Sequence, residues 1–429
     1  MKKIVMKLLA SCSRKIIAKY NPKIIGISGS VGKTGTKEII SLVLANKFKV
    51  RSSIKNYNNE FGLPLTIIGM ESPGKNVFGW LKVFFKAKRL ILFTDKTYPE
   101  VLVLEMGIDR EGDMDYLLSI VRPDIGILTN ISHSHIEYFG SLEKIKKEKS
   151  KLVKNLKKEG VAILNYDNKY LKELSSEIKS KTIFYGIERG ADILAKDINF
   201  ILPKDFLRED FYGINFKIEY QGSVMPINLP KAISNSQVYS ALVAIATGLH
   251  LNLNLVEISE YLKNILPIPG RMNILKGVKN SIIIDDTYNS SPESSLNALR
   301  TLEKIDLKSG RKIVVFGDML ELGHYTEEGH QLIGKKMAEI GLDLIFLIGE
   351  KSRDIGRGAI EAKFDKDRIF NFSSIEEAQE FLKNRIEEGD VLLFKASQGI
   401  RLEKLVKDIM AEPEKSNELL VRQGPAWEN

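Results

Sequence analysis

Residues 23–34 read KIIGISGSVGKT, and this stretch decides the fold class. Its first six residues predict a short buried strand, residues 29–32 a glycine-rich turn, and residues 33–44 a helix. A strand, a glycine loop and a helix in that order form the phosphate-binding unit of α/β proteins. The sequence therefore predicts an α/β fold with a mostly parallel sheet.

The glycine loop predicts a site for nucleotide phosphates. Glycines allow backbone N–H groups to close around phosphate oxygens, and the helix that follows points its positive end at the anion. A lysine can then reach the terminal phosphates, and a neighbouring hydroxyl can bind Mg²⁺. The candidate nucleotide-binding residues are Gly29, Ser30, Val31, Gly32, Lys33 and Thr34. The loop is the short form G-x-x-G-K-T, because Ile27 stands where the commoner form has glycine, and alone it indicates only a nucleotide phosphate.

Further apolar runs predict neighbouring strands. Residues 101–107 (VLVLEMG) and 124–130 (DIGILTN) are apolar without alternation and end in polar residues. Such runs are typical of parallel strands covered on both faces, and ligands bind beyond the carboxyl ends of these strands. Residues 184–230 include alternating apolar and polar stretches, which predicts an antiparallel insertion or a strand-rich lobe. Residues 235–249 lack charged side chains and predict a buried helix.

Strand and helix patterns restart after residues 266–270 (LPIPG), which predict a domain junction. Strands are expected at 281–286, 312–318, 342–349 and 390–397, and helices at 292–304, 326–340 and 375–387. We therefore predict a basic amphipathic helix at 1–20, a central ATP-binding domain at 21–266, and a smaller, Rossmann-like α/β domain at 267–429. The polar tail beyond residue 412 is expected to pack loosely.

The chain carries a formal net charge of +9. Such an excess fits anionic substrates, an acidic membrane surface or nucleic acid, but no nucleic-acid-binding signature accompanies it, so we expect no nucleic-acid partner. The single cysteine, Cys12, excludes an internal disulfide and a zinc cluster. A reducing, cytoplasmic location fits this cysteine usage.

Two basic apolar segments, 1–20 and 79–93, each allow two interpretations. We expect both to be helices packed on the domain, and the alternative for both is a weak contact with an anionic membrane surface. The first segment is too short and interrupted to span a membrane. The apolar residues expected on its buried face are Ile4, Val5, Leu8, Leu9, Cys12, Ile16 and Ile17.

The short phosphate loop and several later segments, in the same order, resemble the Mur ligase family. These segments are 56–64 (NYNNEFGLP), 104–107 (LEMG), 129–131 (TNI), 135–140 (HIEYFG), 269–271 (PGR), 285–289 (DDTYN) with Pro292, 317–323 (GDMLELG) and 395–399 (KASQG). The last three resemble the branch that adds a D-alanyl-D-alanine dipeptide, the MurF type. The resemblance runs from about residue 21 to the end of the chain.

The resemblance implies an ATP-dependent ligase of peptidoglycan precursor synthesis that uses ATP and Mg²⁺. ATP would phosphorylate a peptide carboxylate, and D-Ala-D-Ala or a similar amine would then attack the acyl phosphate. By resemblance, Thr34 and Glu105 would hold Mg²⁺ and His135 a second Mg²⁺. Lys33, His135 and Lys149 would be catalytic, and Lys149 would be carbamylated, although a one-residue slip would select another lysine.

The remaining roles implied by the resemblance belong to nucleotide and substrate. Arg271, Asp286 and Asn289 would contact the nucleotide, with Asp285 as an alternative to Asp286. The expected substrate-binding residues are Asn58, Asn59, Lys395, Ser397 and Arg401. Structural interpretations remain open: a salt-bridged acid for Glu105, a turn histidine for His135, a solvated helix face for Lys149, and an ordinary strand-to-helix turn for 395–401.

The chain departs from the family pattern at three places. Residues 236–244 read SQVYSALVA where the family usually has H-N-x-x-N-A-L-A-A, so Gln237 and Ser240 put the adenine contacts in doubt. Ala396 and Gln398 stand where glycine and arginine are common. About twenty residues precede the phosphate loop, where full-length relatives carry a UDP-binding domain, so the acceptor could be lipid-linked or read by another chain.

Two rival functions follow from these departures. One is a ligase of the same superfamily with another substrate, similar to folylpolyglutamate synthase, which the 285–292 and 317–323 segments oppose. The other is a non-catalytic nucleotide-binding subunit, which the retained Lys33, Thr34, Glu105 and His135 oppose. We expect a monomer or a protein bound to another cell-wall enzyme.

Overall fold

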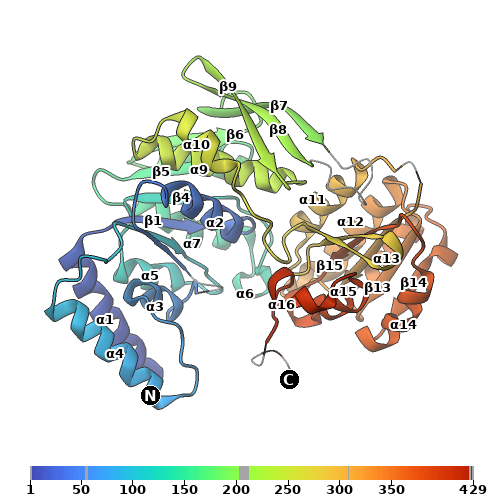
Figure 1. Ribbon diagram of the computed structural model, residues 1–429, viewed down its shortest axis with the longest axis horizontal. Coiled ribbons are helices and arrows are strands. Elements are labelled where there is room, and N and C mark those ends of the chain that lie inside the picture. The colour runs from blue at the N-terminus through green and yellow to red at the C-terminus, as the bar shows by residue number, and fades with distance from the viewer. Residues whose placement is uncertain (1, 54–56, 202–211, 308, 425–426, 428–429) are drawn as a thin grey trace.

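The computed structural model describes residues 2–53, 57–201, 212–307, 309–424 and residue 427. These residues form two sheets, each covered by helices on both faces (Figure 1). The predicted α/β fold with a mostly parallel sheet is confirmed. Asn56, which belongs to one of the family-like segments, and residues 202–211 of the predicted insertion lie outside the described residues.

The larger sheet has nine strands within the described ranges. In sheet order they are β2 (Val50–Ser52), β3 (Val101–Glu105), β1 (Lys23–Ser28), β4 (Ile125–Leu128), β5 (Val161–Asn165), β6 (Lys181–Gly186), β7 (Ile193–Ile201), β8 (Gly213–Tyr220) and β9 (Ser223–Pro230). Strands β2 to β7 pair in parallel, whereas β8 runs antiparallel to both β7 and β9. The antiparallel insertion is thus confirmed for β7 to β9.

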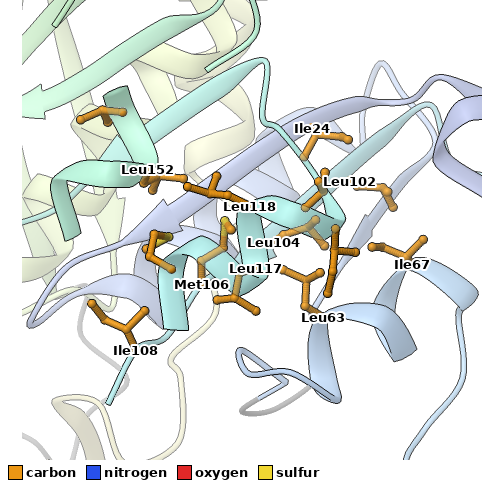
Figure 2. Packing of buried hydrophobic residues seen from close by; sticks show 14 of the residues in the cluster. Ile24, Leu63, Ile67, Leu102, Leu104, Met106, Ile108, Leu117, Leu118 and Leu152 are labelled. Atoms are coloured by element: carbon orange, nitrogen blue, oxygen red, sulfur yellow. The ribbon is translucent and has the colours of Figure 1, made fainter. Parts of the chain in front are cut away.

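Alternate residues of the central strands pack on opposite faces of this sheet, as the period of a strand requires. Ile24, Leu102 and Leu104 point to one face of the sheet. There they pack against residues of the helical layer that covers this face, and Figure 2 shows part of this packing. This layer holds α1 (Lys2–Tyr20), α3 (Gly62–Ile68), α4 (Val77–Leu92), α5 (Asp113–Ile120), α6 (Ile136–Phe139), α7 (Leu142–Lys154) and α8 (Lys169–Leu174). The opposite face packs against α2 (Lys33–Leu44), α9 (Asn235–His250) and α10 (Leu255–Leu262).

The smaller sheet has six strands among the described residues, and only β10 is antiparallel to its neighbour. In sheet order they are β10 (Asn273–Lys276), β11 (Ile282–Asp285), β15 (Val391–Lys395), β12 (Lys312–Gly317), β13 (Leu344–Ile348) and β14 (Ile369–Phe372). One face is covered by α11 (Pro292–Glu303), α12 (Thr326–Glu339) and α13 (Arg353–Glu361), and the other by α14 (Ile375–Arg385) and α15 (Glu403–Ile409).

The predicted N-terminal helix is present as α1, and five of the seven apolar residues expected on its inner face pack against the core. Ile4 and Leu8 are 64% and 49% exposed, although both were expected on the buried face. The buried residues are Leu9, Ala10, Ser13 and Ile16, spaced so that one side of the helix meets α3, α4 and α5. Contact with three helices, which the apolar pattern cannot reveal, selects this face.

The expectation of a loosely packed tail is wrong for residues 413–424. A short helix, α16 (Ser416–Leu419), is followed by Leu420, which is buried in the core of the smaller sheet. Arg422 then donates hydrogen bonds to the buried Glu403 carboxylate. The polar composition of this segment predicted a loose tail, but Leu420 and the Arg422–Glu403 ion pair hold it against the domain.

Candidate active site

A cavity of about 1240 Å³ lies between the two sheets and is lined by residues of both. On one side it is bounded by the carboxyl ends of β1 and β3, which pair so that Ile27 is opposite Glu105. On the other side it is bounded by residues that follow β11 and β15. Of the predicted site residues, the cavity lining includes Ser30, Val31, Gly32, Lys33, Thr34, Asn58, Asn59, Glu105, His135, Arg271, Asp286, Asn289, Lys395 and Ser397.

The phosphate loop has a backbone that requires glycine. Gly29 and Gly32 have φ angles of 145° and 88°, which side-chain-bearing residues rarely adopt. A Cβ at Gly29 would also collide with the Thr129 hydroxyl. The loop after β4 holds this shape, because the Val31 N–H donates to Asn130 Oδ1 at 2.7 Å and Thr129 Oγ1 donates to the Val31 carbonyl at 2.6 Å. The N terminus of α2 therefore opens into the cavity with its loop fixed.

Two lysines meet at the Gly29 carbonyl. Lys33 Nζ donates to this oxygen at 2.7 Å, and Lys149 Nζ donates to it at 3.2 Å. Burial lowers the pKa of both amines, and repulsion from Lys33 lowers the pKa of Lys149 further. Lys149 is 2% exposed, whereas Lys146 and Lys151 form ion pairs nearer the surface. This placement favours Lys149 over its neighbours as the lysine that serves the loop.

Residues from three segments converge on Thr34. Its hydroxyl donates to Glu105 Oε2 at 3.2 Å, and Arg271 Nη2 donates to the same hydroxyl at 3.2 Å. Asn58 Nδ2 donates to the other oxygen of Glu105 at 3.2 Å. The Arg271 guanidinium lies 3.7 Å from the centre of the Tyr288 ring. The positively charged Arg271 side chain, from the half with the smaller sheet, therefore lies at the phosphate loop of the other half.

His135 links the two halves of the molecule at the far side of the loop. Its Nδ1 lies 2.6 Å from Glu321 Oε2 and 3.7 Å from Asp109 Oδ1. This close contact with His135 lowers the pKa of Glu321. The backbone reinforces this contact, because the Glu137 N–H donates to the Glu321 carbonyl at 3.2 Å.

The two adjacent aspartates after β11 have different surroundings. Asp286 lines the cavity, accepts a hydrogen bond from the Met272 N–H and pairs with Lys395 Nζ at 2.6 Å. Asp285 is buried and accepts hydrogen bonds from the Gly270 N–H and from Thr287. Burial raises the pKa of Asp285 to about 6. This geometry favours Asp286 as the ligand contact and gives Asp285 a structural position.

Other predicted residues have structural partners. Asn59 Oδ1 accepts from the Phe61 and Gly62 N–H groups at the start of α3. Ser397 Oγ accepts from the Leu320 N–H, and the Asn289 carbonyl accepts from Lys395. Gln237 forms the capping box of α9 with Ser234. Arg401 lies outside the cavity lining and pairs with Glu403 at 2.6 Å, so the structure does not bring it to the predicted substrate site.

The sequence motifs assign no role to Glu321 or Asp109, although both line the cavity. Glu321 stands in the 317–323 segment that carries part of the family resemblance, so its position there was an available signal. Asp109 follows the strand-end Glu105 by four residues, and its closeness to His135 depends on loop packing. His133, also without an assigned role, stacks on Tyr325 with ring centres 4.8 Å apart.

The residues around Thr34 fit a Mg²⁺–nucleotide. A hydroxyl and a carboxylate provide the hard oxygen ligands that Mg²⁺ prefers, and Mg²⁺ usually keeps several waters beside phosphate oxygens. Across the described residues, no group of three or more His, Cys, Asp or Glu side chains could hold a metal. Thr34 and Glu105 would hold such a metal together with phosphate oxygens of the nucleotide.

Family comparisons define the class of this protein. The Mur ligase middle domain matches residues 85–248, and the domain described as "Mur ligase, glutamate ligase domain" matches residues 270–398. The chain belongs to the Mur ligase family, and it is an ATP-dependent ligase of carbon–nitrogen bonds that uses ATP with Mg²⁺. The resemblance inferred from the sequence motifs is confirmed.

The relatives to which this chain is similar include ligases that share one name. The UDP-N-acetylmuramoyl-tripeptide–D-alanyl-D-alanine ligase of Synechocystis is 31% identical over 395 residues, which cover 92% of this chain and 76% of that protein. The ligase of the same name from Bacillus subtilis is 29% identical, covering 94% and 79%. The structure of MurF ligase from Thermotoga maritima in complex with ADP matches with a TM-score of 0.76 and 26% identity, covering 96% and 84%.

Proposed function

We propose that this chain joins the peptide carboxylate of a peptidoglycan precursor to the amine of D-alanyl-D-alanine. The names of its relatives support this pair of substrates, since they act on a UDP-N-acetylmuramoyl-tripeptide and D-alanyl-D-alanine. The same proposal places the reaction in the cytoplasm, with the chain acting as a monomer or beside another cell-wall enzyme. No helix within the described ranges is long and apolar enough to cross a membrane.

One observation carries the proposal: the hydroxyl of Thr34 contacts both Glu105 from the larger sheet and Arg271 from the smaller one. Phosphoryl transfer depends mainly on positioning and on neutralising charge. The phosphate loop binds phosphate, a strand-end carboxylate favours a metal beside it, and an arginine from the second half adds positive charge at the same point. This combination suits the activation of a carboxylate by ATP.

We propose the following division of roles on this geometry. The 29–34 loop, Arg271, Asp286 and Asn289 hold the nucleotide, and Thr34 and Glu105 hold a Mg²⁺ that neutralises charge on the phosphates. His135 and Lys149 help to bind a second Mg²⁺ near the reacting carboxylate. Asn58, Asn59, Lys395 and Ser397 face the substrates. The division into domains at 21–266 and 267–429 is part of the same proposal.

The reaction is balanced by transfer of one phosphoryl group. The substrate carboxylate attacks the γ-phosphorus of ATP, the bond to the bridging oxygen breaks, and ADP leaves. The dipeptide amine then attacks the activated carbonyl, the amide bond forms, and phosphate leaves together with one proton from the amine. Lys33 and Arg271 lie where negative charge accumulates during the first step.

The direct test supplies the purified protein with ATP, Mg²⁺, UDP-N-acetylmuramoyl-tripeptide and D-alanyl-D-alanine. We expect phosphate release that requires both the acceptor and the dipeptide, together with one amide product by mass spectrometry. Lys33→Ala should abolish ligation without unfolding the protein, whereas Lys158→Ala, at an exposed position on the same half, should retain it. Full ligation by Lys33→Ala would refute the assignment of the loop.

The same assay separates the rivals. Phosphate release with a different acid or amine, and none with this pair, would show a ligase for another substrate. Nucleotide binding without any phosphate release across a panel of acceptor peptides would show a non-catalytic subunit.

A further inference from the structure

The positive charge of this chain is concentrated on two helices. Helix α1 carries six basic residues and α4 carries four, and neither contains an aspartate or glutamate. These ten charges exceed the net charge of +9 for the whole chain, so the remainder of the chain has a net charge of −1. The two helices together therefore carry as much positive charge as the net excess of the whole chain.

The two helices lie side by side. Lys19 Nζ, near the end of α1, donates to the Leu90 carbonyl near the end of α4 at 3.0 Å, and the Tyr20 hydroxyl donates to the Phe93 carbonyl at 3.0 Å. Each helix buries one side against the larger half, through Leu9 and Ile16 in α1 and through Val83 and Ala87 in α4. The pair is thus anchored as one unit.

The outer sides of the same helices expose large apolar side chains. Phe78 and Phe85 of α4 are 77% and 72% exposed, and Ile4 and Leu8 of α1 are also exposed. The full set of exposed large apolar residues on or directly after these helices is Ile4, Leu8, Val77, Phe78, Leu81, Phe85, Leu92 and Phe93. Of the fifteen exposed large apolar residues in the described ranges, eight lie here. Such clustering marks an interaction surface rather than scattered exposure.

We propose that the outer face of the α1–α4 pair is a docking surface for an anionic lipid bilayer. Exposed aromatic and aliphatic side chains would enter the boundary between headgroups and acyl chains, while the surrounding lysines and arginines would contact the anionic headgroups. Lys82 and Lys88 are exposed on α4, and Lys3 and Lys7 on α1, in position for this role. The buried sides already pack on the protein, so docking requires no rearrangement of the helices.

The shape and charge of the surface favour a bilayer over other occupants. The pair lies at the outer edge of the molecule (Figure 1), and its apolar residues stand on projecting helices of 19 and 16 residues. By the helical rise these helices are about 29 Å and 24 Å long, so they present a long surface to a planar partner. A second copy of the chain would bring ten like charges against ten, because neither helix offers an acidic residue.

Docking there would also orient the active site. Lys2 and Met6, at the start of α1, line the cavity between the two sheets. The end of the cavity next to α1 would consequently lie close to the membrane surface.

The test is co-sedimentation of the full chain with lipid vesicles. The anionic vesicles contain about 30 mol% phosphatidylglycerol in phosphatidylcholine, and the salt concentration is low because salt screens interactions between surface charges. Under these conditions we expect most of the protein to sediment. Pure phosphatidylcholine should bind at least fivefold less, and 0.5 M salt should reduce binding to the anionic vesicles. No binding to the anionic vesicles, or equal binding to both kinds, would overturn the proposal.

Paired variants locate the surface. Lys82→Glu/Lys88→Glu and Leu81→Ser/Phe85→Ser should each lower binding at least fivefold, and Lys3→Glu/Lys7→Glu provides an independent test on the other helix. The matched controls are Lys383→Glu/Lys404→Glu and Val224→Ser/Val256→Ser, at exposed positions away from the pair, and these should bind like the unaltered chain. Equal losses in the controls would overturn the proposal. So would an α1–α4 surface that drives self-association in size-exclusion chromatography but binds no vesicles. Ligation of soluble substrates should be unchanged in all these variants, which keeps this test separate from that of the proposed function.

Discussion

The surroundings of Lys149 favour the neutral form of its amine. Its amine is buried next to Lys33, and both contact one backbone carbonyl. Burial of two neighbouring ammonium groups is costly, and loss of a proton from one of them relieves that cost. Because its pKa lies well below the usual value, Lys149 has a larger share of neutral, nucleophilic amine than an exposed lysine. This neutral form is the one to which CO₂ adds to give a carbamate and one proton.

We expect Lys149→Ala to lower kcat for ligation by about 100-fold or more, the scale of losing a group that acts in the chemical step. Lys147→Ala, at the exposed position two residues earlier, should change kcat less than twofold. In ¹³C-bicarbonate buffer, a carbamate resonance should be visible by NMR for the unaltered protein and for Lys147→Ala, and absent for Lys149→Ala. Full activity of Lys149→Ala would rule out its proposed role.

Asp285 links a residue to the pH dependence of stability. Burial raises its pKa from 3.8 to about 6, so between these values the folded protein keeps a proton that the unfolded chain releases. The free energy of unfolding therefore falls as pH rises from about 4 to 6, by on the order of 3 kcal/mol. Asp285→Asn removes this titration. Compared with the unaltered protein in urea denaturation, the variant should gain relative stability between pH 4 and pH 7.

A control sets the baseline for this comparison. Asp306→Asn changes an aspartate at an exposed position of the same half, and its stability should follow that of the unaltered protein at every pH. If Asp285→Asn also followed it, the buried carboxyl would not be protonated in the folded state.

At the scale of the element, the sequence predicts best where local chemistry and packing agree. Residues 23–28 and 33–44 form β1 and α2 with the predicted bounds, because a glycine loop with positive φ angles separates an apolar strand from the helix. The inner face of α1 was predicted correctly except for Ile4 and Leu8, because contacts with distant segments decide how much of an apolar helix side is covered. The 395–401 segment shows the same limit: its motif places Ser397 at the cavity, but only the fold pairs Arg401 with Glu403.

A buried ion pair holds the segment after α15 in place. The Glu403 carboxylate is fully buried between Arg401 and Arg422, and Arg422 also donates to the Tyr288 carbonyl at 2.9 Å. Arg422→Ala should lower the free energy of unfolding by about 3 kcal/mol, the low end for leaving a buried charge short of a partner. Denaturation in urea measures this loss.

Two further variants give this result its meaning. Arg353→Ala, at an exposed position at the start of α13, should change stability by less than about 0.5 kcal/mol. Adding Glu403→Gln to Arg422→Ala removes the buried carboxylate charge and should recover part of the loss. If the double variant were less stable than the single one, packing rather than charge would explain the effect of Arg422.

At the scale of the whole molecule, several polar contacts join the two halves across the cavity. Arg271 bonds Thr34 across the cavity, and His135 and the Glu137 N–H both contact Glu321 on the loop after β12. An active site shared between two halves is completed only when they close, and such closure commonly gates turnover. Glu321 is therefore expected to act as a positioning residue for the closed arrangement.

Removal of this contact should favour the open arrangement. We expect Glu321→Ala to raise the KM for ATP about tenfold, which corresponds to about 1.4 kcal/mol, and to increase the radius of gyration measured by small-angle X-ray scattering with ADP and Mg²⁺. The matched control, Glu328→Ala, alters an exposed acid at the start of α12 and should leave both quantities unchanged. Because the contact with His135 lowers the pKa of Glu321, the carboxylate should hold this contact at neutral pH and lose it only in acidic solution, below the ordinary pKa of a glutamate. An unaltered radius of gyration in Glu321→Ala, with KM raised, would assign Glu321 to substrate binding instead of closure.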